Sequence, residues 1–252
     1  MTLILTILTL FVLISVLFVL VLVRFDRGEK EPRSALWSAF GMGVLAVALA
    51  IGLEVYFVHE MTTGTLYNLR QVFVSSLKVA IIEELAKCLP LAIFIYRKKY
   101  FNEHTDGVMY FAIAGLAFGL VENILYTLQF GAEVGVARLI LTPLFHAATT
   151  GLIGSALIKV KLDRTSPFRF LAMLLAVILL HALYDFGVLS GLPIFIAGSV
   201  LLTFGLGVAL FMTMYAARRA DERVEYFKRK LLRSRAAKLG HRRRLERQAA
   251  TE

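Results

Sequence analysis

Two adjacent carboxylates and a lysine stand in a stretch that is otherwise suited to a lipid bilayer. Glu83, Glu84 and Lys87 lie within the sequence VAIIEELAKCLP. A charged side chain near the centre of a bilayer costs at least ~2.5–3.5 kcal/mol on insertion scales. The i,i+4 spacing pairs Glu83 with Lys87 on one helix face, whereas Glu84 lies about 100° further round, facing Cys88. The cost of burying these charges favours a functional role.

Other ionisable residues recur at a similar depth in three further apolar stretches. They are Glu122, followed by Asn123, in FGLVENILY; His146 in TPLFHAATTG; and His181 with Asp185 in LLHALYDFG. Counted along a helix from the expected cytosolic boundary, these groups and Glu83 lie about 18–24 Å deep. A lone buried histidine or glutamate is often structural, but a shared depth predicts convergence on one water-filled cavity that opens toward the outer leaflet.

The elements that must position these groups are membrane-spanning helices. Apolar residues make up 58% of the chain and charged residues 18%, against about 45–50% and 25% in soluble domains. A single cysteine excludes an internal disulfide and a cysteine-based metal cluster. We predict an all-α fold, a polytopic transmembrane helix bundle of about seven spans with a basic C-terminal cytosolic helix. The expected spans are Thr2–Val23, Leu36–Val58, Val72–Tyr96, Val108–Phe130, Leu139–Ile158, Phe168–Leu189 and Leu192–Tyr215.

The loop charges predict the orientation of the chain in the cell membrane. Odd-numbered connections are rich in Lys and Arg and even-numbered ones are nearly free of them, so the N-terminus is expected outside and the C-terminus in the cytosol. We divide the chain into a transmembrane domain, residues 1–216, and a basic cytosolic tail, residues 217–252. The tail is expected to bind anionic lipid, with nucleic acid an unlikely partner. His104 and Asp106 are expected to be solvated in a cytosolic turn.

Four segments together resemble the PrsW family of intramembrane proteases. They are EELAK, FGLVENILY, the stretch around His146 and HALYDF, spread over residues 72–190. The family is distantly similar to the CAAX-processing endopeptidases, which also use a glutamate pair and two intramembrane histidines. The resemblance implies cleavage of a single-span membrane protein near the outer face, typically an anti-sigma factor. Where the family commonly has Asn, four residues after the last His, this chain has Asp185.

Peptide hydrolysis needs an activated water, a donor to the oxyanion and a proton donor for the leaving amine. The candidate catalytic residues are Glu83, Glu84, Glu122, His146 and His181, with Lys87, Asn123 and Asp185 in support. A glutamate and a neutral histidine can deprotonate water together, while the second histidine or Asn123 donates to the oxyanion. Because no HExxH motif is present, we favour a glutamic mechanism without a cofactor. The alternative is a zinc site formed by His146, His181 and a glutamate.

Two other classes of protein would also bury carboxylates and histidines. A proton-coupled transporter needs them along its pathway, and would keep uptake activity in Glu84→Gln without any proteolysis. A non-catalytic scaffold would use the polar layer only to join helices, and its polar-layer variants would lose stability rather than activity.

Overall fold

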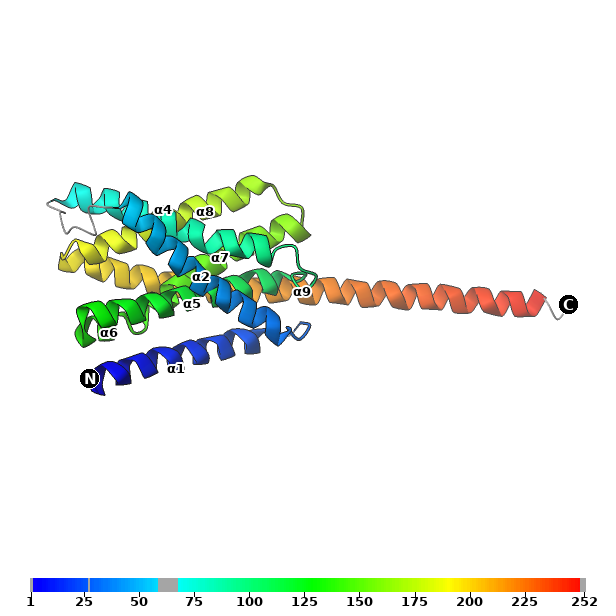
Figure 1. The fold of residues 1–252 in the computed structure, drawn as a ribbon. Coiled ribbons are helices and arrows are strands. Elements are labelled where there is room, and N and C mark those ends of the chain that lie inside the picture. Colours follow the sequence, from blue (N-terminus) through cyan, green and yellow to red (C-terminus); the bar gives the residue numbers. More distant parts are fainter. Residues whose placement is uncertain (1, 27, 59–67, 250–252) are drawn as a thin grey trace.

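The computed structural model describes residues 2–26, 28–58 and 68–249, with side chains up to Arg235, and within these ranges it is helical without strands (Figure 1). The helices are α1 (Thr2–Phe25), α2 (Arg33–Phe57), α4 (Leu69–Phe94), α5 (His104–Phe130), α6 (Ala132–Arg138), α7 (Leu141–Leu162), α8 (Pro167–Leu189) and α9 (Pro193–Ala249). The predicted all-α helix bundle is confirmed.

Six of the described helices are long and apolar enough to cross a membrane, namely α1, α2, α5, α7, α8 and the first part of α9. The remaining long helix, α4, has 26 residues and runs through the bundle between α2 and α8. Its polar residues point inward, because Glu83, Glu84 and Lys87 are buried whereas Leu85 and Leu89 are exposed. Helix α4 therefore corresponds to the third expected span, and it turns its charged side chains toward the interior of the bundle.

Helices α5 and α7 form the centre of the bundle and pack very closely against each other. Glycines permit this approach, since a Cβ at Gly115 would collide with the main-chain carbonyl of His146, and one at Gly154 with that of Gly107. Small residues therefore fix the distance between the two helices that carry Glu122 and His146.

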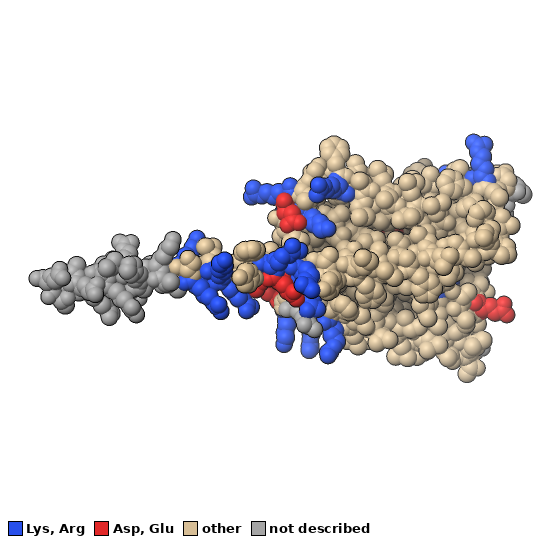
Figure 2. All heavy atoms as spheres, turned by 180° about the vertical axis from the view of Figure 1, so that it is seen from behind, with Lys and Arg blue, Asp and Glu red and all other residues tan. Residues whose placement is uncertain are grey.

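Lysine and arginine side chains gather at the end of the bundle from which α9 projects (Figure 2), which we call the basic end. The α9 helix continues without a break from the bundle through the expected boundary between residues 216 and 217. The basic tail is therefore a direct extension of the last bundle helix.

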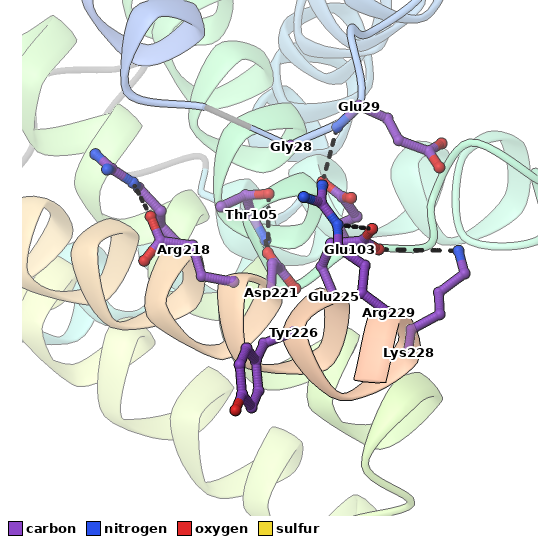
Figure 3. A pocket seen from close by; sticks show the side chains of 11 residues that line it. Gly28, Glu29, Glu103, Thr105, Arg218, Asp221, Glu225, Tyr226, Lys228 and Arg229 are labelled. Carbon is purple, nitrogen blue, oxygen red and sulfur yellow. Dashed lines mark hydrogen bonds and ion pairs between the residues drawn. The ribbon is translucent and has the colours of Figure 1, made fainter. Parts of the chain in front are cut away.

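A hydrogen-bonded junction attaches α9 to the basic end of the bundle (Figure 3). The carboxylate of Asp221 accepts hydrogen bonds from the main-chain N–H groups of His104 (2.8 Å) and Thr105 (2.9 Å) at the start of α5. The His104 ring lies 2.7 Å from Asp221 and 2.9 Å from Asp163, which follows α7. The expectation that His104 and Asp106 are solvated is wrong, because both are buried. His104 contacts Asp221 of α9, and the Asp106 carboxylate accepts hydrogen bonds from the main-chain N–H groups of Asn102 and Glu103.

Candidate active site

One buried lysine on α4 contacts both adjacent glutamates. Lys87 Nζ lies 2.8 Å from Glu84 Oε1 and 3.4 Å from Glu83 Oε2. The i,i+4 pair with Glu83 is therefore present, but the closer contact is with Glu84, which was expected on another part of the helix beside Cys88. Residues three and four apart share a helix face, so one ammonium group balances two carboxylates. Breaking such a pair would leave an uncompensated charge in the protein interior.

His181, on α8, is oriented by the second of these glutamates. Its Nδ1 lies 2.7 Å from Glu84 Oε1, and a carboxylate can only accept, so this nitrogen carries the proton. The other ring nitrogen, Nε2, lies 3.7 Å from Glu83 Oε2 and 3.5 Å from Asp185 Oδ2. Glu84 thus fixes the imidazole so that its Nε2 faces Glu83.

His146, on α7, is held at both ring nitrogens. Lys87 Nζ lies 2.9 Å from Nδ1, and an ammonium group can only donate, so Nδ1 is the acceptor of this hydrogen bond. The Nε2–H then donates to Glu122 Oε2 at 2.8 Å. These two contacts specify a neutral imidazole in a single tautomer, whose Nδ1 faces the glutamate pair.

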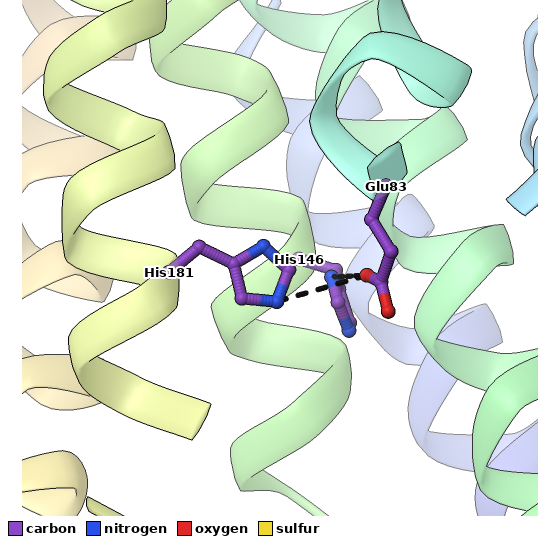
Figure 4. A group of neighbouring side chains, drawn as sticks. All are labelled: Glu83, His146 and His181. Carbon is purple, nitrogen blue, oxygen red and sulfur yellow. Dashed lines mark ion pairs between the residues drawn. The ribbon is translucent and has the colours of Figure 1, made fainter. Parts of the chain in front are cut away.

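Glu83, His146 and His181 converge from three helices on one point (Figure 4). One ligand-type atom from each of them lies within 4.8 Å of the other two. The buried Glu83 Oε2 lies 4.0 Å from His146 Nδ1 and 3.7 Å from His181 Nε2, and makes no hydrogen bond within the described part of the chain. An unsatisfied carboxylate oxygen between two imidazoles is suited to bind a water or a cation.

Aromatic rings surround this convergence. The ring of Phe118 lies 5.0 Å from the His146 ring, Phe145 lies 5.1 Å from the His181 ring, and Tyr184 stacks on Phe145. The two imidazoles are only 2% and 1% exposed. The two imidazoles are therefore shielded from the surface, whereas the Glu122 and Asp185 side chains beside them are 16% and 19% exposed. The surrounding rings keep the local dielectric low.

Glu122 and Asn123 are joined to an arginine that the sequence interpretation missed. Arg138, on α6, forms an ion pair with Glu122 and donates its Nε–H to Asn123 Oδ1 at 3.1 Å. The Asn123 amide in turn donates to the carbonyl of Arg138 at 3.0 Å. Both the oxygen and the nitrogen of the Asn123 amide are thus engaged with Arg138. The sequence signal that could have identified Arg138 is that it is the only basic residue in its expected outer loop.

The residues present match the donor types of a zinc site. Two imidazole nitrogens and a carboxylate oxygen are common zinc ligands, and Glu83 Oε2 lacks a competing hydrogen bond. However, Lys87 occupies the lone pair of His146 Nδ1. Binding of an ion would require this ammonium group to move toward the two carboxylates.

A bundle of apolar helices around a buried centre of glutamates and histidines defines a multi-pass membrane protein with the groups that peptide hydrolysis requires. The sequence profile of the family described as "PrsW family intramembrane metalloprotease" matches residues 31–227, and the chain belongs to this family. The resemblance of its motifs is thereby confirmed.

Curated relatives carry the same family name. The chain is 31% identical over 163 residues to Protease PrsW of Bacillus subtilis (strain 168), which covers 64% of this chain and 72% of that protein. It is 30% identical over 166 residues to Protease PrsW of Geobacillus kaustophilus, covering 66% and 72%, and 27% identical over 189 residues to that of Oceanobacillus iheyensis, covering 74% and 85%. No solved structure matches the chain.

Proposed function

We propose that this membrane protease is an endopeptidase that cleaves single-span membrane proteins, with Glu83, His146 and His181 as its reacting groups. The observation that carries the proposal is the position of Glu83 Oε2, which lies between two imidazole nitrogens without a hydrogen bond. Buried ionisable groups are costly in a membrane, and this arrangement directs three of them at one point.

The contacts suit each of the three groups to a different chemical role. Glu83 is the general base, because its free oxygen faces the space that a water must occupy. His146 Nδ1 shares that water once Lys87 turns toward the carboxylates. His181 Nε2 faces the same space. As an imidazolium, with its Nδ1–H on Glu84, the ring donates a hydrogen bond from Nε2 to the oxyanion and then gives that proton to the leaving amine. The proton that Glu83 took from the water then returns to Nε2. A water that is hydrogen-bonded to both Glu83 Oε2 and His181 Nε2 requires these two atoms to be about 4.5–5 Å apart. Their separation of 3.7 Å must therefore increase by about 1 Å before the reaction.

The positive charge of Lys87 favours a mechanism without a metal ion. Its ammonium group lies within 3.4 Å of Glu83 Oε2 and 2.9 Å of His146 Nδ1, where it would repel a divalent cation. If an ion is bound, Glu83, His146 and His181 would hold it. A bound zinc ion would polarise the scissile carbonyl and favour ionisation of its water.

The proposed topology places the reaction near the outer face. By the positive-inside rule the basic end faces the cytosol, with the C-terminus inside, the N-terminus outside and the basic tail near anionic lipid. Helix α6 lies at the opposite end of the bundle from the tail (Figure 1), and its Arg138 contacts Glu122 beside His146. The scissile bond is therefore close to the outer boundary of the substrate span, as in regulated proteolysis of an anti-sigma factor.

A cleavage assay in proteoliposomes tests the proposal with membrane-anchored candidate substrates. We expect wild-type protein to cleave with and without a chelator, and Glu83→Gln to be inactive although it accumulates normally. Loss of cleavage on chelation, with recovery on adding Zn²⁺, would replace the glutamic mechanism with the metal-dependent one. Solute uptake that persists in Glu84→Gln without proteolysis would favour a transporter instead.

A further inference from the structure

An apolar groove runs along the bundle surface, away from the candidate active site. It has a volume of about 380 Å³ and is formed by α1 between Val12 and Leu20, by the start of α2, and by Ile113 of α5 beneath. Both walls meet at the basic end, because the connection between α1 and α2 lies there (Figure 1). The groove is therefore exposed to the hydrocarbon of the leaflet at the basic end.

A cation and an aromatic ring stand at the mouth of this groove. Arg33, the first residue of α2, lines it together with Trp37, which is 72% exposed. Among the described residues, no carboxylate forms an ion pair with Arg33. A guanidinium group binds phosphate oxygens through paired hydrogen bonds, and tryptophan favours the boundary between headgroups and hydrocarbon. The rim thus has the chemistry to bind a phospholipid headgroup.

The lining of the groove favours a phospholipid over a peptide helix. The stretch from Val12 to Leu20 covers about 12 Å of helix axis and is apolar except for Ser15. Arg33 is the one charged side chain among the described residues that line the groove, and it stands at the start of α2. A cation at one end and an apolar lining along the rest match a phosphate followed by an acyl chain.

We propose that this groove binds an anionic phospholipid of the leaflet at the basic end, with one acyl chain between α1 and α2 and the phosphate on Arg33. The basic end carries most of the lysine and arginine side chains visible on the surface, and their field favours an anionic headgroup over a zwitterionic one (Figure 2). The lipid would fill the gap between two helices that make few contacts with each other. The proposal does not depend on the protease mechanism.

The chain contains a single tryptophan, so its fluorescence comes from one position, at the mouth of the groove. The full chain in detergent would be titrated with phosphatidylglycerol brominated on its acyl chains, and in parallel with brominated phosphatidylcholine. We expect saturable quenching of Trp37 by the anionic lipid, with an apparent affinity at least about tenfold higher than for phosphatidylcholine. Arg33→Gln should weaken binding of the anionic lipid about tenfold, since it removes a charge-assisted hydrogen bond.

Matched variants separate the groove from the general surface. Val16→Phe fills the groove and should abolish saturable quenching, whereas Leu17→Phe, on the exposed face of the same helix, should not. Arg24→Gln removes a charge from the same end without touching the groove and should leave the affinity within about twofold. Native mass spectrometry of the wild type should show retained phosphatidylglycerol. Equal titrations for the two lipids, or unchanged binding in Arg33→Gln or Val16→Phe, would overturn the proposal.

Discussion

Arg138 and Glu122 form an ion pair that connects the short helix α6 to the centre of the bundle. The other oxygen of the same carboxylate accepts the Nε2–H of His146 at 2.8 Å. A residue at the end of the bundle therefore fixes the tautomer and orientation of an imidazole that faces the glutamate pair. We therefore expect Glu122 to position His146, whereas its sequence motif placed it among the reacting groups.

Replacing Arg138 should lower turnover without abolishing it. Loss of a group that orients an active-site histidine typically costs about 10–100-fold, and we expect such a decrease in kcat for Arg138→Gln with little change in KM. Arg138→Lys should recover only part of the loss, because lysine cannot contact Glu122 and Asn123 as a planar fork. Arg70→Gln, an exposed arginine at the start of α4, serves as the control and should retain wild-type kcat.

Replacing each of the two adjacent glutamates should have a different effect on cleavage and on stability. Glu83→Gln removes the proposed base and should reduce cleavage by about 10²–10⁴-fold, with a melting temperature close to that of the wild type. Glu84→Gln weakens contacts with both Lys87 and His181, and should also lower the free energy of unfolding by about 3 kcal/mol. Cleavage rates and thermal unfolding in detergent would measure both effects. Wild-type turnover in both variants would refute the assignment of this pair to the active site.

Close packing of α5 on α7 should be sensitive to a single methyl group. In Gly115→Ala the new Cβ meets the main-chain carbonyl of His146, so the helices must separate, at a cost of about 1–3 kcal/mol. Gly41→Ala is the matched control, because nothing lies within 4 Å of a Cβ at that position in α2. Denaturant unfolding should show a loss for Gly115→Ala and none for Gly41→Ala. Equal stabilities would show that this approach does not constrain the bundle.

The junction at the basic end should become more stable as the pH falls. Burial, followed by the nearby Asp221 carboxylate, raises the pKa of Glu103 from 4.5 to about 7. Between these values the folded state binds more protons than the unfolded state, so stability falls as pH rises through the window. Glu103→Gln removes this titration, and its melting temperature relative to wild type should therefore be higher at pH 8 than at pH 5. A difference that is independent of pH would contradict the assignment.

The proposed orientation can be tested with cysteines introduced on a Cys88→Ser background. Cysteine at Ser234, on the projecting part of α9, should react with an impermeant reagent only after the cells are opened. Cysteine at Glu133, on α6, should react in intact cells. External labelling of the Ser234 position would reverse the topology, and with it the expected side of cleavage.

The sequence alone determined the helices. A bilayer leaves no water for main-chain groups, so apolar runs of about 20 residues must become helices, and hydropathy finds six of them. The expected third span, with its four charged residues, indeed forms α4 in the bundle. Charges in such a stretch must face other polar groups, which is why Glu83, Glu84, Glu122, His146 and His181 could be grouped as one site from their depth. The convergence of Glu83 with the two histidines came only from the structure.

Only the tertiary structure decided which partner each polar group has. Lys87 lies closer to Glu84 than to Glu83. Arg138 contacts both Glu122 and Asn123. Asp221 contacts the ring of the buried His104. These contacts join helices that are far apart in the sequence or depend on which of two adjacent faces a side chain covers. Helical periodicity fixes directions around one axis, but not the rotation and approach of neighbouring helices. Those are set by side-chain packing, such as the contact of Gly115 with the main chain of His146.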